Sequence, residues 1–271
     1  MKIKTTEFDN GDLIVNNDFI DLMESNGLMS SEKLYALESE TVKSIVKERG
    51  TSRAFLSTER GDRLEVYIKR YTDVPLKEKL KLKLFFKPKT ADAFDEWRAI
   101  CRYHESGLKT MLPIAAGRVG DKTCNLTLGI TDYVRASDLF RAFKECDSGR
   151  KEKLIKKIAE YCAVMHSNNM AHQDLYLVHF FVKESEDDAV YLIDLQRTII
   201  QPRLSRRWHV KDLAQLLFSA EGLVSEDEIS LFWDIYTNIF GAELKNDGAF
   251  IKSVRNKAAR ILARDRRKRT V

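Results

Sequence analysis

Residues 172–194 read HQDLYLVHFFVKESEDDAVYLID, and this pattern predicts a β-hairpin. Leu177–Val182 is apolar, Glu184–Asp188 is a charged and polar run typical of a turn, and Val190–Leu195 is apolar again. Two apolar runs on either side of a polar turn are the simplest signature of paired antiparallel strands. The polar residues of this stretch should therefore lie at the two ends of a hairpin.

The register of the hairpin decides which side chains meet. In an antiparallel pair, each step outward along one strand is matched by a step outward along the other. If Val182 pairs with about Val190, Asp194 lies opposite about Val178. Three polar side chains then converge at one end of the hairpin, namely Asp174, His179 and Asp194.

The composition describes a folded protein with a substantial core. The chain has 271 residues, of which 44% are hydrophobic and 10% aromatic, so one large domain or two lobes are expected. Its apolar stretches are far shorter than the roughly 18 to 20 residues of a membrane span. The first residues, MKIKTTEFD, lack the apolar run of a secretory signal. We expect a cytoplasmic protein that does not cross a bilayer.

The four cysteines are interpreted as ordinary thiols. They stand at positions 101, 124, 146 and 162, without a Cys-x-x-Cys pair or a histidine at zinc-finger spacing. Free cysteine usually behaves as a small buried hydrophobic residue. A cysteine metal site is therefore not expected.

Periodicity divides the chain into a β-rich part and a helical part, which indicates the α+β class. Short extended segments between residues 41 and 68 predict an antiparallel meander. Residues 93–103 have apolar side chains at helical spacing, and Gly107 closes that helix. Another extended segment, Leu126–Ile130, precedes a polar connector, where we place the boundary between two lobes.

Three segments result from that boundary. Residues 1–40 are an N-terminal extension packed on the small lobe, with two short helices on either side of Asn26-Gly27. Residues 41–130 form the small β-rich lobe. Residues 131–271 form a larger, mainly helical lobe, which includes an amphipathic helix over 151–167 that Asn168-Asn169 could terminate.

Five side chains occur in the order and approximate spacing of the protein-kinase signature set. Lys69 ends a predicted strand, and Glu96 lies on the next helix 27 residues later. Asp174 follows the amphipathic helix. His179 comes five residues after Asp174, and Asp194 comes 20 residues after Asp174. This order predicts a protein-kinase-like fold with two lobes and Mg·ATP between them.

Each of these residues has a defined task in phosphoryl transfer, where the protein mainly positions the donor and neutralises charge. Lys69 would hold the α- and β-phosphates, and Glu96 would aim its ammonium through an ion pair. Asp194 would bind Mg²⁺, which prefers carboxylate oxygens. Asp174 would orient the acceptor hydroxyl and take its proton. The predicted catalytic residues are thus Asp174, Lys69 and Asp194.

Several residues near the predicted site have structural or alternative tasks. His179 stands where kinases have a metal-binding Asn, so it is a candidate ligand of Mg²⁺ or nucleotide beside Asp194. Imidazole is a poor ligand for a hard cation, and a bond from His179 to a phosphate or to Asp194 is the alternative. Asp212, expected at the start of a helix, would accept backbone N–H groups of the catalytic loop. His172 is expected to pack and hold that loop, whereas surface or capping positions are expected for His104, His166 and His209.

These segments resemble a known family. HQDLYLVHF at 172–180 and LIDLQR at 192–197, followed by SRRW at 205–208 and KDL at 211–213, resemble the Kdo/WaaP family of bacterial lipopolysaccharide core kinases. The resemblance extends over roughly residues 41–270. It implies a protein-kinase-like fold and transfer of the ATP γ-phosphate to an inner-core sugar, which is heptose in one branch and Kdo in another.

The motif details are similar to the heptose branch, with two departures. Tyr-x-x-His-Phe follows Asp174, and Asp194 begins Asp-Leu-x-Arg, as in that branch. Gln173 stands where the family often has Arg, which argues against control by a phosphorylated loop. Gln196 stands where the family often has His, which leaves the acceptor open. The match to the glycine-rich loop of kinases is weak, because Gly50-Thr51-Ser52 contains a single Gly.

Positive charge is concentrated at the C-terminus. Residues 251–271 contain nine Lys and Arg against one Asp, a charge of +8 that leaves −3 for the rest of a chain whose net charge is +5. Apolar residues at helical spacing make this segment a basic amphipathic helix. It would pack on the large lobe with a solvated charged end, or it would contact anionic lipid at the cytoplasmic face of the inner membrane. Nucleic-acid binding is not expected, because no motif accompanies the charge.

A second basic group follows the hairpin. In a kinase this part of the chain builds the acceptor side, and guanidinium groups suit the phosphates and carboxylates of a lipopolysaccharide core. We hypothesise that the core contacts Arg197, Arg203, Arg206, Arg207 and Lys211.

The sequence and its resemblance together indicate an ATP-dependent kinase whose acceptor is a heptose of the lipopolysaccharide core oligosaccharide. Two alternatives remain open. One is a kinase on the same fold that acts on Kdo or another small molecule. The other is a nucleotide-binding pseudokinase that serves as a scaffold.

Overall fold

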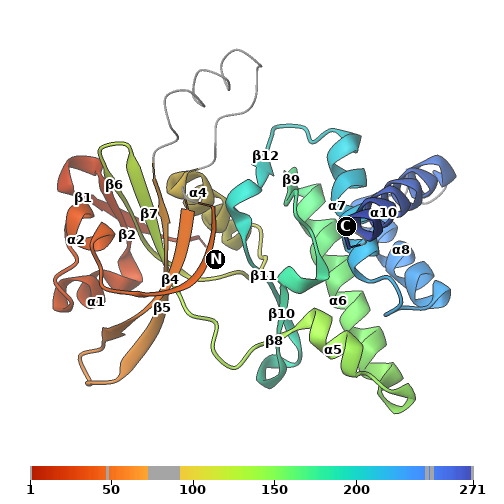
Figure 1. Cartoon of the computed structure of the whole chain (residues 1–271), viewed down its shortest axis with the longest axis horizontal. Helices are drawn as coiled ribbons and strands as arrows, with labels where there is room; N and C mark the ends of the chain where they lie inside the picture. Colours follow the sequence, from red (N-terminus) through yellow and green to blue (C-terminus); the bar gives the residue numbers. More distant parts are fainter. Residues whose placement is uncertain (1, 47–48, 73–91, 242–243, 245–246, 270–271) are drawn as a thin grey trace. The chain divides into compact units, whose positions relative to one another are not determined.

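The computed structural model describes residues 2–46, 49–72, 92–241, 244 and 247–269 (Figure 1). The chain forms two compact units. The first comprises Met1–Glu105 and Met111–Thr131, and the second comprises Ser106–Thr110 and Asp132–Val271.

The first unit is built on an antiparallel sheet of seven strands among its described residues. The expected meander is confirmed, because β3 (Glu40–Val46), β4 (Arg49–Ser57) and β5 (Arg63–Tyr71) pair as consecutive antiparallel neighbours. β5 also pairs with β7 (Lys122–Leu128), which the sequence predicted in part, and β7 pairs on its other side with β6 (Pro113–Val119). The strands lie in the order β1 (Thr5–Phe8), β2 (Leu13–Asn16), β6 (Pro113–Val119), β7 (Lys122–Leu128), β5 (Arg63–Tyr71), β4 (Arg49–Ser57) and β3 (Glu40–Val46).

The first 40 residues add two strands and two helices to this unit. The two expected helices are α1 (Ile20–Ser25) and α2 (Ser31–Tyr35). Gly27 between them has φ +67°, a left-handed conformation that favours glycine. Strands β1 and β2 were not expected, and β2 pairs with β6 to extend the sheet.

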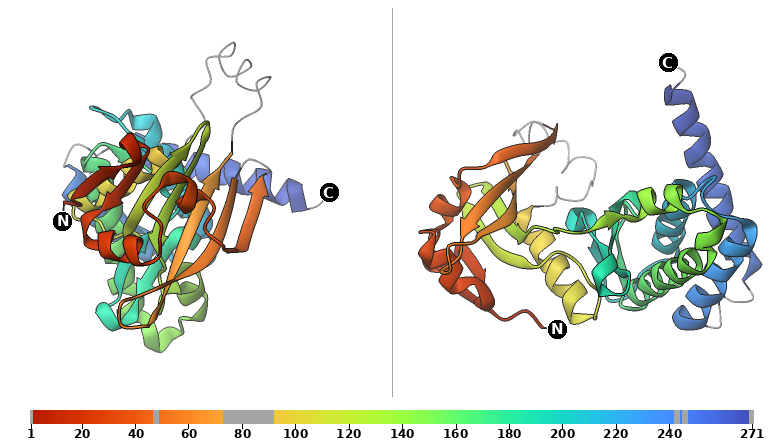
Figure 2. Two further views of the ribbon diagram at one scale, coloured as in Figure 1. Left: turned by 90° about the vertical axis from the view of Figure 1, so that its left-hand side faces the viewer. Right: turned by 90° about the horizontal axis from the view of Figure 1, so that it is seen from below.

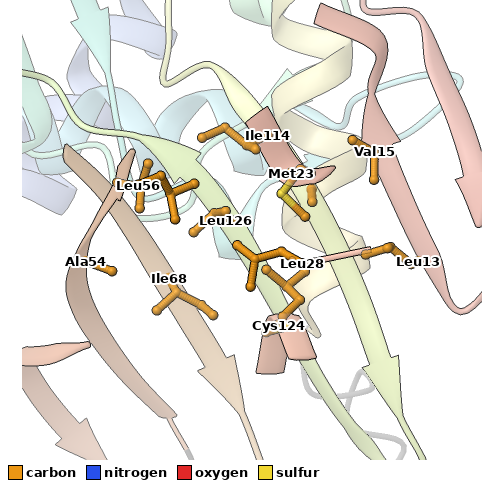
Figure 3. Close-up of a cluster of buried hydrophobic side chains, with 13 residues drawn as sticks. Leu13, Val15, Met23, Leu28, Ala54, Leu56, Ile68, Ile114, Cys124 and Leu126 are labelled. Atoms are coloured by element: carbon orange, nitrogen blue, oxygen red, sulfur yellow. The ribbon is translucent and has the colours of Figure 1, made fainter. Parts of the chain in front are cut away.

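Apolar residues on one face of the sheet pack against these N-terminal helices (Figure 3). Alternate residues of the strands point to the same face, so Val66 and Ile68 of β5 lie beside Cys124 and Leu126 of β7. Met23 lies on this face and is fully buried. The N-terminal segment is therefore part of the core of the first unit.

Helix α4 (Ala93–Glu105) covers the other face of the sheet (Figure 2). Asp92 caps its first turn, because its side chain accepts a hydrogen bond from the backbone N–H of Asp95 at 2.9 Å. Gly107, with φ +75°, follows the helix as the sequence predicted. Trp97 and Ile100 are buried on the inner side of α4. Residues of β5 that alternate with the core residues therefore face this helix.

The second unit is mainly helical and contains the predicted hairpin. Strand β10 (Phe180–Lys183) pairs with β11 (Ala189–Leu192) in the expected register, Val182 opposite Val190. The strands are shorter than the apolar runs, because Leu177–His179 and Leu195–Arg197 form 3-10 turns. Strand β8 (Val134–Arg135) joins the other edge of β10, and β9 (Met170–Ala171) pairs with β12 (Ile199–Ile200).

The principal helices of this unit are α5 (Ala136–Ala142), α6 (Ser148–Ser167), α7 (Arg206–Ser219), α8 (Glu226–Phe240) and α10 (Gly248–Arg269). Asn168 caps α6 as predicted. Helix α7 begins at Arg206, so the prediction that Asp212 starts a helix was wrong and Asp212 lies in the middle of α7. Helix α8 was not predicted, although Ser225 and Glu228 form a capping box at its start.

The basic amphipathic helix is confirmed as α10, which packs on α7. Phe250, Val254 and Ala258 are buried, and Arg255 pairs with Glu226 of α8 at 2.7 Å. Its first turns are therefore held by apolar contacts and an ion pair. None of the helices within the described ranges is long and apolar enough to span a membrane.

Candidate functional site

In the first unit, Lys69 and Glu96 form the predicted ion pair. Ile68 points into the apolar core, so Lys69, the next residue on β5, points toward α4. Its Nζ lies 2.5 Å from Oε1 of Glu96, and the two side chains are 18% and 1% exposed. Both side chains are thus largely shielded from solvent. Removing either partner would leave a buried, uncompensated charge, which is strongly destabilising.

Two neutral donors fix the other oxygen of Glu96. Tyr71 donates its hydroxyl hydrogen to Oε2 at 2.8 Å, and Asn125 donates from Nδ2 to the same oxygen at 2.9 Å. The period of two places Tyr71 on the same face as Lys69, and Asn125 lies opposite Lys69 in the β5–β7 register. The sequence predicted a role for neither residue. The alternation of side chains along a strand does place Tyr71 on the same face as Lys69, so Tyr71 could have been predicted.

In the second unit, Asp212 holds the backbone of the loop that presents Asp174. Its Oδ2 accepts the backbone N–H of His172 at 2.7 Å, and its Oδ1 accepts that of Gln173 at 2.8 Å. The brace expected of Asp212 is thus confirmed. Gln173 has φ +68°, a conformation that costs a non-glycine residue about 1–3 kcal/mol and needs such support.

A buried polar cluster surrounds Asp212. Nε2 of His166 lies 3.4 Å from Oδ2 of Asp212, and Nδ1 of His166 lies 2.8 Å from the hydroxyl of Tyr236 on α8. The ring of His209 lies 4.8 Å from that of His166. Burial lowers the pKa of His209 to about 3, so its ring stays neutral.

The surface or capping positions expected for three histidines were wrong. His104, His166 and His209 are all buried. Each lies on the inward face of a helix, and a single polar residue among apolar neighbours gives no sign of the partner that satisfies it. His104 contacts the carbonyl oxygen of Met111 at 3.0 Å.

His172 connects the loop to the residue before Asp194. Its Nε2 lies 3.0 Å from the carbonyl oxygen of Ile193, and a carbonyl only accepts, so Nε2 carries the hydrogen. Nδ1 is then free to accept the backbone N–H of Asp174 at 3.3 Å. Burial lowers the pKa of His172, which keeps the ring neutral. The structural role predicted for His172 is confirmed.

Asp174, His179 and Asp194 meet at the end of the hairpin, as the register predicted. Nδ1 of His179 donates to the backbone carbonyl of Asp174 at 2.8 Å, and its Nε2 lies 4.0 Å from Oδ2 of Asp194. The backbone N–H of Ile193 donates to the carbonyl of His179 at 3.0 Å. Asp194 has φ +66°. The Nε2 lone pair and the Asp194 carboxylate therefore lie side by side.

The donor set here is small for a metal. Across the part of the chain that the structure describes, no group of three or more His, Cys, Asp and Glu could hold a metal ion. Mg²⁺ bound with a nucleotide commonly takes one or two carboxylates and completes its shell with phosphates and water. Asp194 fits that pattern, with His179 as the neighbouring nitrogen.

Arg197 forms an ion pair with Asp174 that sequence reasoning did not foresee. Its Nη1 lies 2.9 Å from Oδ2 and 3.2 Å from Oδ1 of Asp174. The 3-10 turn Leu195–Arg197 brings it there, and Gln173 donates from Nε2 to the carbonyl of Arg197 at 2.6 Å. The side chains of Arg197 and Asp174 are 53% and 25% exposed.

The predicted site residues thus form two groups. Lys69 and Glu96 meet in the first unit, whereas Asp174, His179 and Asp194 meet in the second. Each group has the internal contacts expected of it.

Comparison with known proteins gives the family and the fold. The family described as "Lipopolysaccharide kinase (Kdo/WaaP) family" matches residues 32–236. "Lipopolysaccharide core heptose(I) kinase WaaP" of Escherichia coli is 29% identical over 219 residues, 74% of this chain and 82% of the relative. The Pseudomonas aeruginosa protein of the same name is 27% identical over 189 residues, 65% and 70% of the two chains.

A solved structure, "WaaP in complex with acyl carrier protein", is similar with a TM-score of 0.71 and 22% identity. The likeness covers 92% of this chain and 98% of that chain. The expected α+β, protein-kinase-like fold is therefore confirmed.

Proposed function

Because the chain belongs to the lipopolysaccharide kinase (Kdo/WaaP) family, we propose that it transfers the γ-phosphate of ATP to a heptose hydroxyl of the lipopolysaccharide inner core. The family match carries this proposal, since residues 32–236 include both groups of candidate site residues. Relatives named as heptose(I) kinases support the choice of heptose. The Tyr-x-x-His-Phe and Asp-Leu-x-Arg motifs agree with it.

Lys69 is proposed to bind the α- and β-phosphates of ATP. An ammonium on a flexible stem serves this task only when it is aimed. The buried Glu96 carboxylate, itself fixed by Tyr71 and Asn125, supports that aim. Lys69 thus brings a positive charge to the phosphates in a defined position.

Asp194 is proposed to hold Mg²⁺, with His179 beside it as a second ligand or as a contact to phosphate. Bound Mg²⁺ would neutralise charge on the phosphate oxygens. The hydrogen bond from Nδ1 of His179 to the Asp174 carbonyl leaves Nε2 as an acceptor near the Asp194 carboxylate. Two acceptors side by side suit a shared cation.

Asp174 is proposed to orient the acceptor hydroxyl and to take its proton. Asp212 and His172 fix the backbone on which Asp174 stands. A carboxylate held this way can accept a hydroxyl proton without moving its loop.

The C-terminal end of α10 is proposed to contact anionic lipid at the cytoplasmic face of the inner membrane. The buried apolar residues of α10 end at Ala258, and the following turns expose Arg260 and Arg264. Each Arg near an anionic surface contributes about 1 kcal/mol. Arg260→Ala with Arg264→Ala should weaken sedimentation with phosphatidylglycerol vesicles, and unchanged sedimentation would contradict this contact.

Radiolabelled ATP with a panel of core-truncated lipopolysaccharide acceptors tests the proposed reaction. Label should enter acceptors that retain the inner-core heptose and no acceptor that lacks it. Transfer to Kdo alone or to a soluble small molecule would favour the other kinases on this fold. ATP binding without transfer to any acceptor would favour a pseudokinase.

A further inference from the structure

The contact between Arg197 and Asp174 joins a cation to the candidate proton acceptor. One nitrogen of Arg197 lies within hydrogen-bond distance of both carboxylate oxygens. A hydroxyl that is to lose its proton to Asp174 needs one of those oxygens. The ion pair therefore occupies an acceptor position on each carboxylate oxygen, which leaves fewer positions for the acceptor hydroxyl.

A second cation lies next to this pair. Nζ of Lys211 lies 3.3 Å from Oε1 of Gln173, and it also lies over the ring of Trp208 at 5.7 Å. Burial lowers the pKa of the Lys211 ammonium, and the positive charge of Arg197 lowers it further. Asp212 has both oxygens engaged by backbone N–H groups. Lys211 thus contacts a neutral amide oxygen, and an anionic group of an acceptor would offer its ammonium a stronger partner.

The structure separates these two cations from other members of the basic group predicted to contact the acceptor. Arg206 pairs with Asp247, and Arg207 lies over the ring of Trp208 at 4.4 Å. Arg197 and Lys211 instead contact the loop residues Asp174 and Gln173 themselves. They are the members placed to act on the acceptor at the point of transfer.

The pair is also built to exchange its partner. Ion pairs with this much exposure are weak, because water screens the charges and the long side chain loses freedom. The Gln173 amide holds the backbone carbonyl of Arg197 at 2.6 Å, so the side chain can turn away while its backbone stays fixed. A guanidinium forms strong paired hydrogen bonds with phosphate or carboxylate.

We propose that Arg197 and Lys211 determine acceptor specificity: an anionic group of the acceptor saccharide, phosphate or carboxylate, replaces Asp174 as the partner of Arg197 and thereby frees Asp174 for the acceptor hydroxyl. This inference rests on the proposed function. It adds that an uncharged saccharide is a poor acceptor because nothing draws Arg197 off Asp174.

Steady-state kinetics with three acceptors test this inference. The acceptors are the intact core oligosaccharide, the same oligosaccharide after dephosphorylation, and the same oligosaccharide after reduction of its carboxyl groups. The variants are Arg197→Ala, Arg197→Lys and Lys211→Met. Arg141→Ala is the control, because Arg141 is an exposed arginine of α5 that pairs with Asp138 one turn away.

Arg197→Ala should raise the KM for the intact acceptor by at least tenfold and change the KM for ATP by less than twofold. The ratio of variant to wild-type KM should fall toward one with whichever modified acceptor has lost the recognised anion, which identifies phosphate or carboxylate. Arg197→Lys should regain part of the affinity, and Lys211→Met should act in the same direction as Arg197→Ala. Arg141→Ala should behave as wild type.

Two results would overturn the inference in different ways. Equal KM ratios for all three acceptors, or a loss confined to kcat, would show that Arg197 does not recognise an acceptor anion, while the proposed function would stand. Absence of transfer from the wild-type protein to all three acceptors would reject the proposed function and this inference with it. The unchanged KM for ATP shows that each variant is folded.

Discussion

Each unit of this protein has a buried carboxylate that positions a candidate catalytic residue, and the two carboxylates do so differently. Glu96 accepts from a charged Lys69 and from two neutral side chains, so it aims a side chain. Asp212 accepts two backbone N–H groups and contacts a histidine, so it fixes a loop. In the proposed roles, Lys69 would bring a directed charge to the phosphates, whereas Asp174 would accept a proton from a fixed backbone.

The largest effect is expected from Asp174, because neither Glu96 nor Asp212 could take over its proposed role as proton acceptor. Asp174→Asn removes the proposed proton acceptor and keeps the shape of the loop that Asp212 braces. We expect kcat to fall about 10²–10⁴-fold with little change in ATP affinity. Single-turnover transfer and a nucleotide-binding titration would measure the two quantities. A wild-type rate in Asp174→Asn would rule out this role.

Lys69→Met should expose the dependence of Glu96 on a charged partner. It leaves a fully buried carboxylate without its cation, which should cost about 3–5 kcal/mol of unfolding free energy. The double variant Lys69→Met with Glu96→Gln should recover much of this loss, because no buried charge remains. Urea denaturation would compare the variants. Equal stability of the single and double variants would contradict the account of this pair.

Asp212→Asn should have a smaller effect on stability. An amide has one oxygen, so its NH₂ group would face a backbone N–H of His172 or Gln173, at a cost of about 1–3 kcal/mol. The brace would weaken, so kcat should fall with little change in the KM for ATP. Urea denaturation and a phosphoryl-transfer assay of Asp212→Asn and the wild-type protein would test both expectations. A rise in the KM for ATP without a fall in kcat would contradict the proposed role of Asp212 in fixing the loop of Asp174.

Acid should act on the buried cluster around Asp212. Burial lowers the pKa of His209 to about 3 from an ordinary value near 6.5, so between these values the unfolded chain binds the extra proton. Stability is therefore complete above pH 6.5 and is lost as the pH falls toward 3, by about 2 kcal/mol at pH 5 for this group. Denaturation at pH 7 and pH 5 measures the difference.

His209→Phe is the matched variant for the acid effect. Nε2 of His209 is buried and has no hydrogen-bond partner among the described residues, so an apolar ring should replace it at low cost. The stability difference between pH 7 and pH 5 should shrink in this variant. A difference equal to that of wild type would show that other groups cause the acid sensitivity.

The parts of the fold that local pattern could predict are those whose partners lie nearby in the chain. The hairpin register followed from a short polar turn between apolar runs, and the convergence of Asp174 with Asp194 followed from that register. The predicted ion pair of Lys69 with Glu96 needed the kinase-like order as well. Local periodicity and motif spacing were sufficient here.

Contacts set by distant pairing could not be read from the sequence. Strand β2 pairs with β6 about 100 residues later, and Asn125 reaches Glu96 only through the β5–β7 register. The contact of Arg197 with Asp174 depends on a left-handed Asp194 and a 3-10 turn after it, which no periodicity indicates. Backbone geometry at single residues decides such contacts.

Phosphorus NMR of lipopolysaccharide would detect the proposed heptose phosphorylation in cells. Lipopolysaccharide would be taken from cells that contain this chain, from cells that lack it, and from cells that carry Asp174→Asn. We expect a phosphomonoester on an inner-core heptose with the wild-type chain alone. The same heptose phosphate in all three samples, or in none, would contradict it.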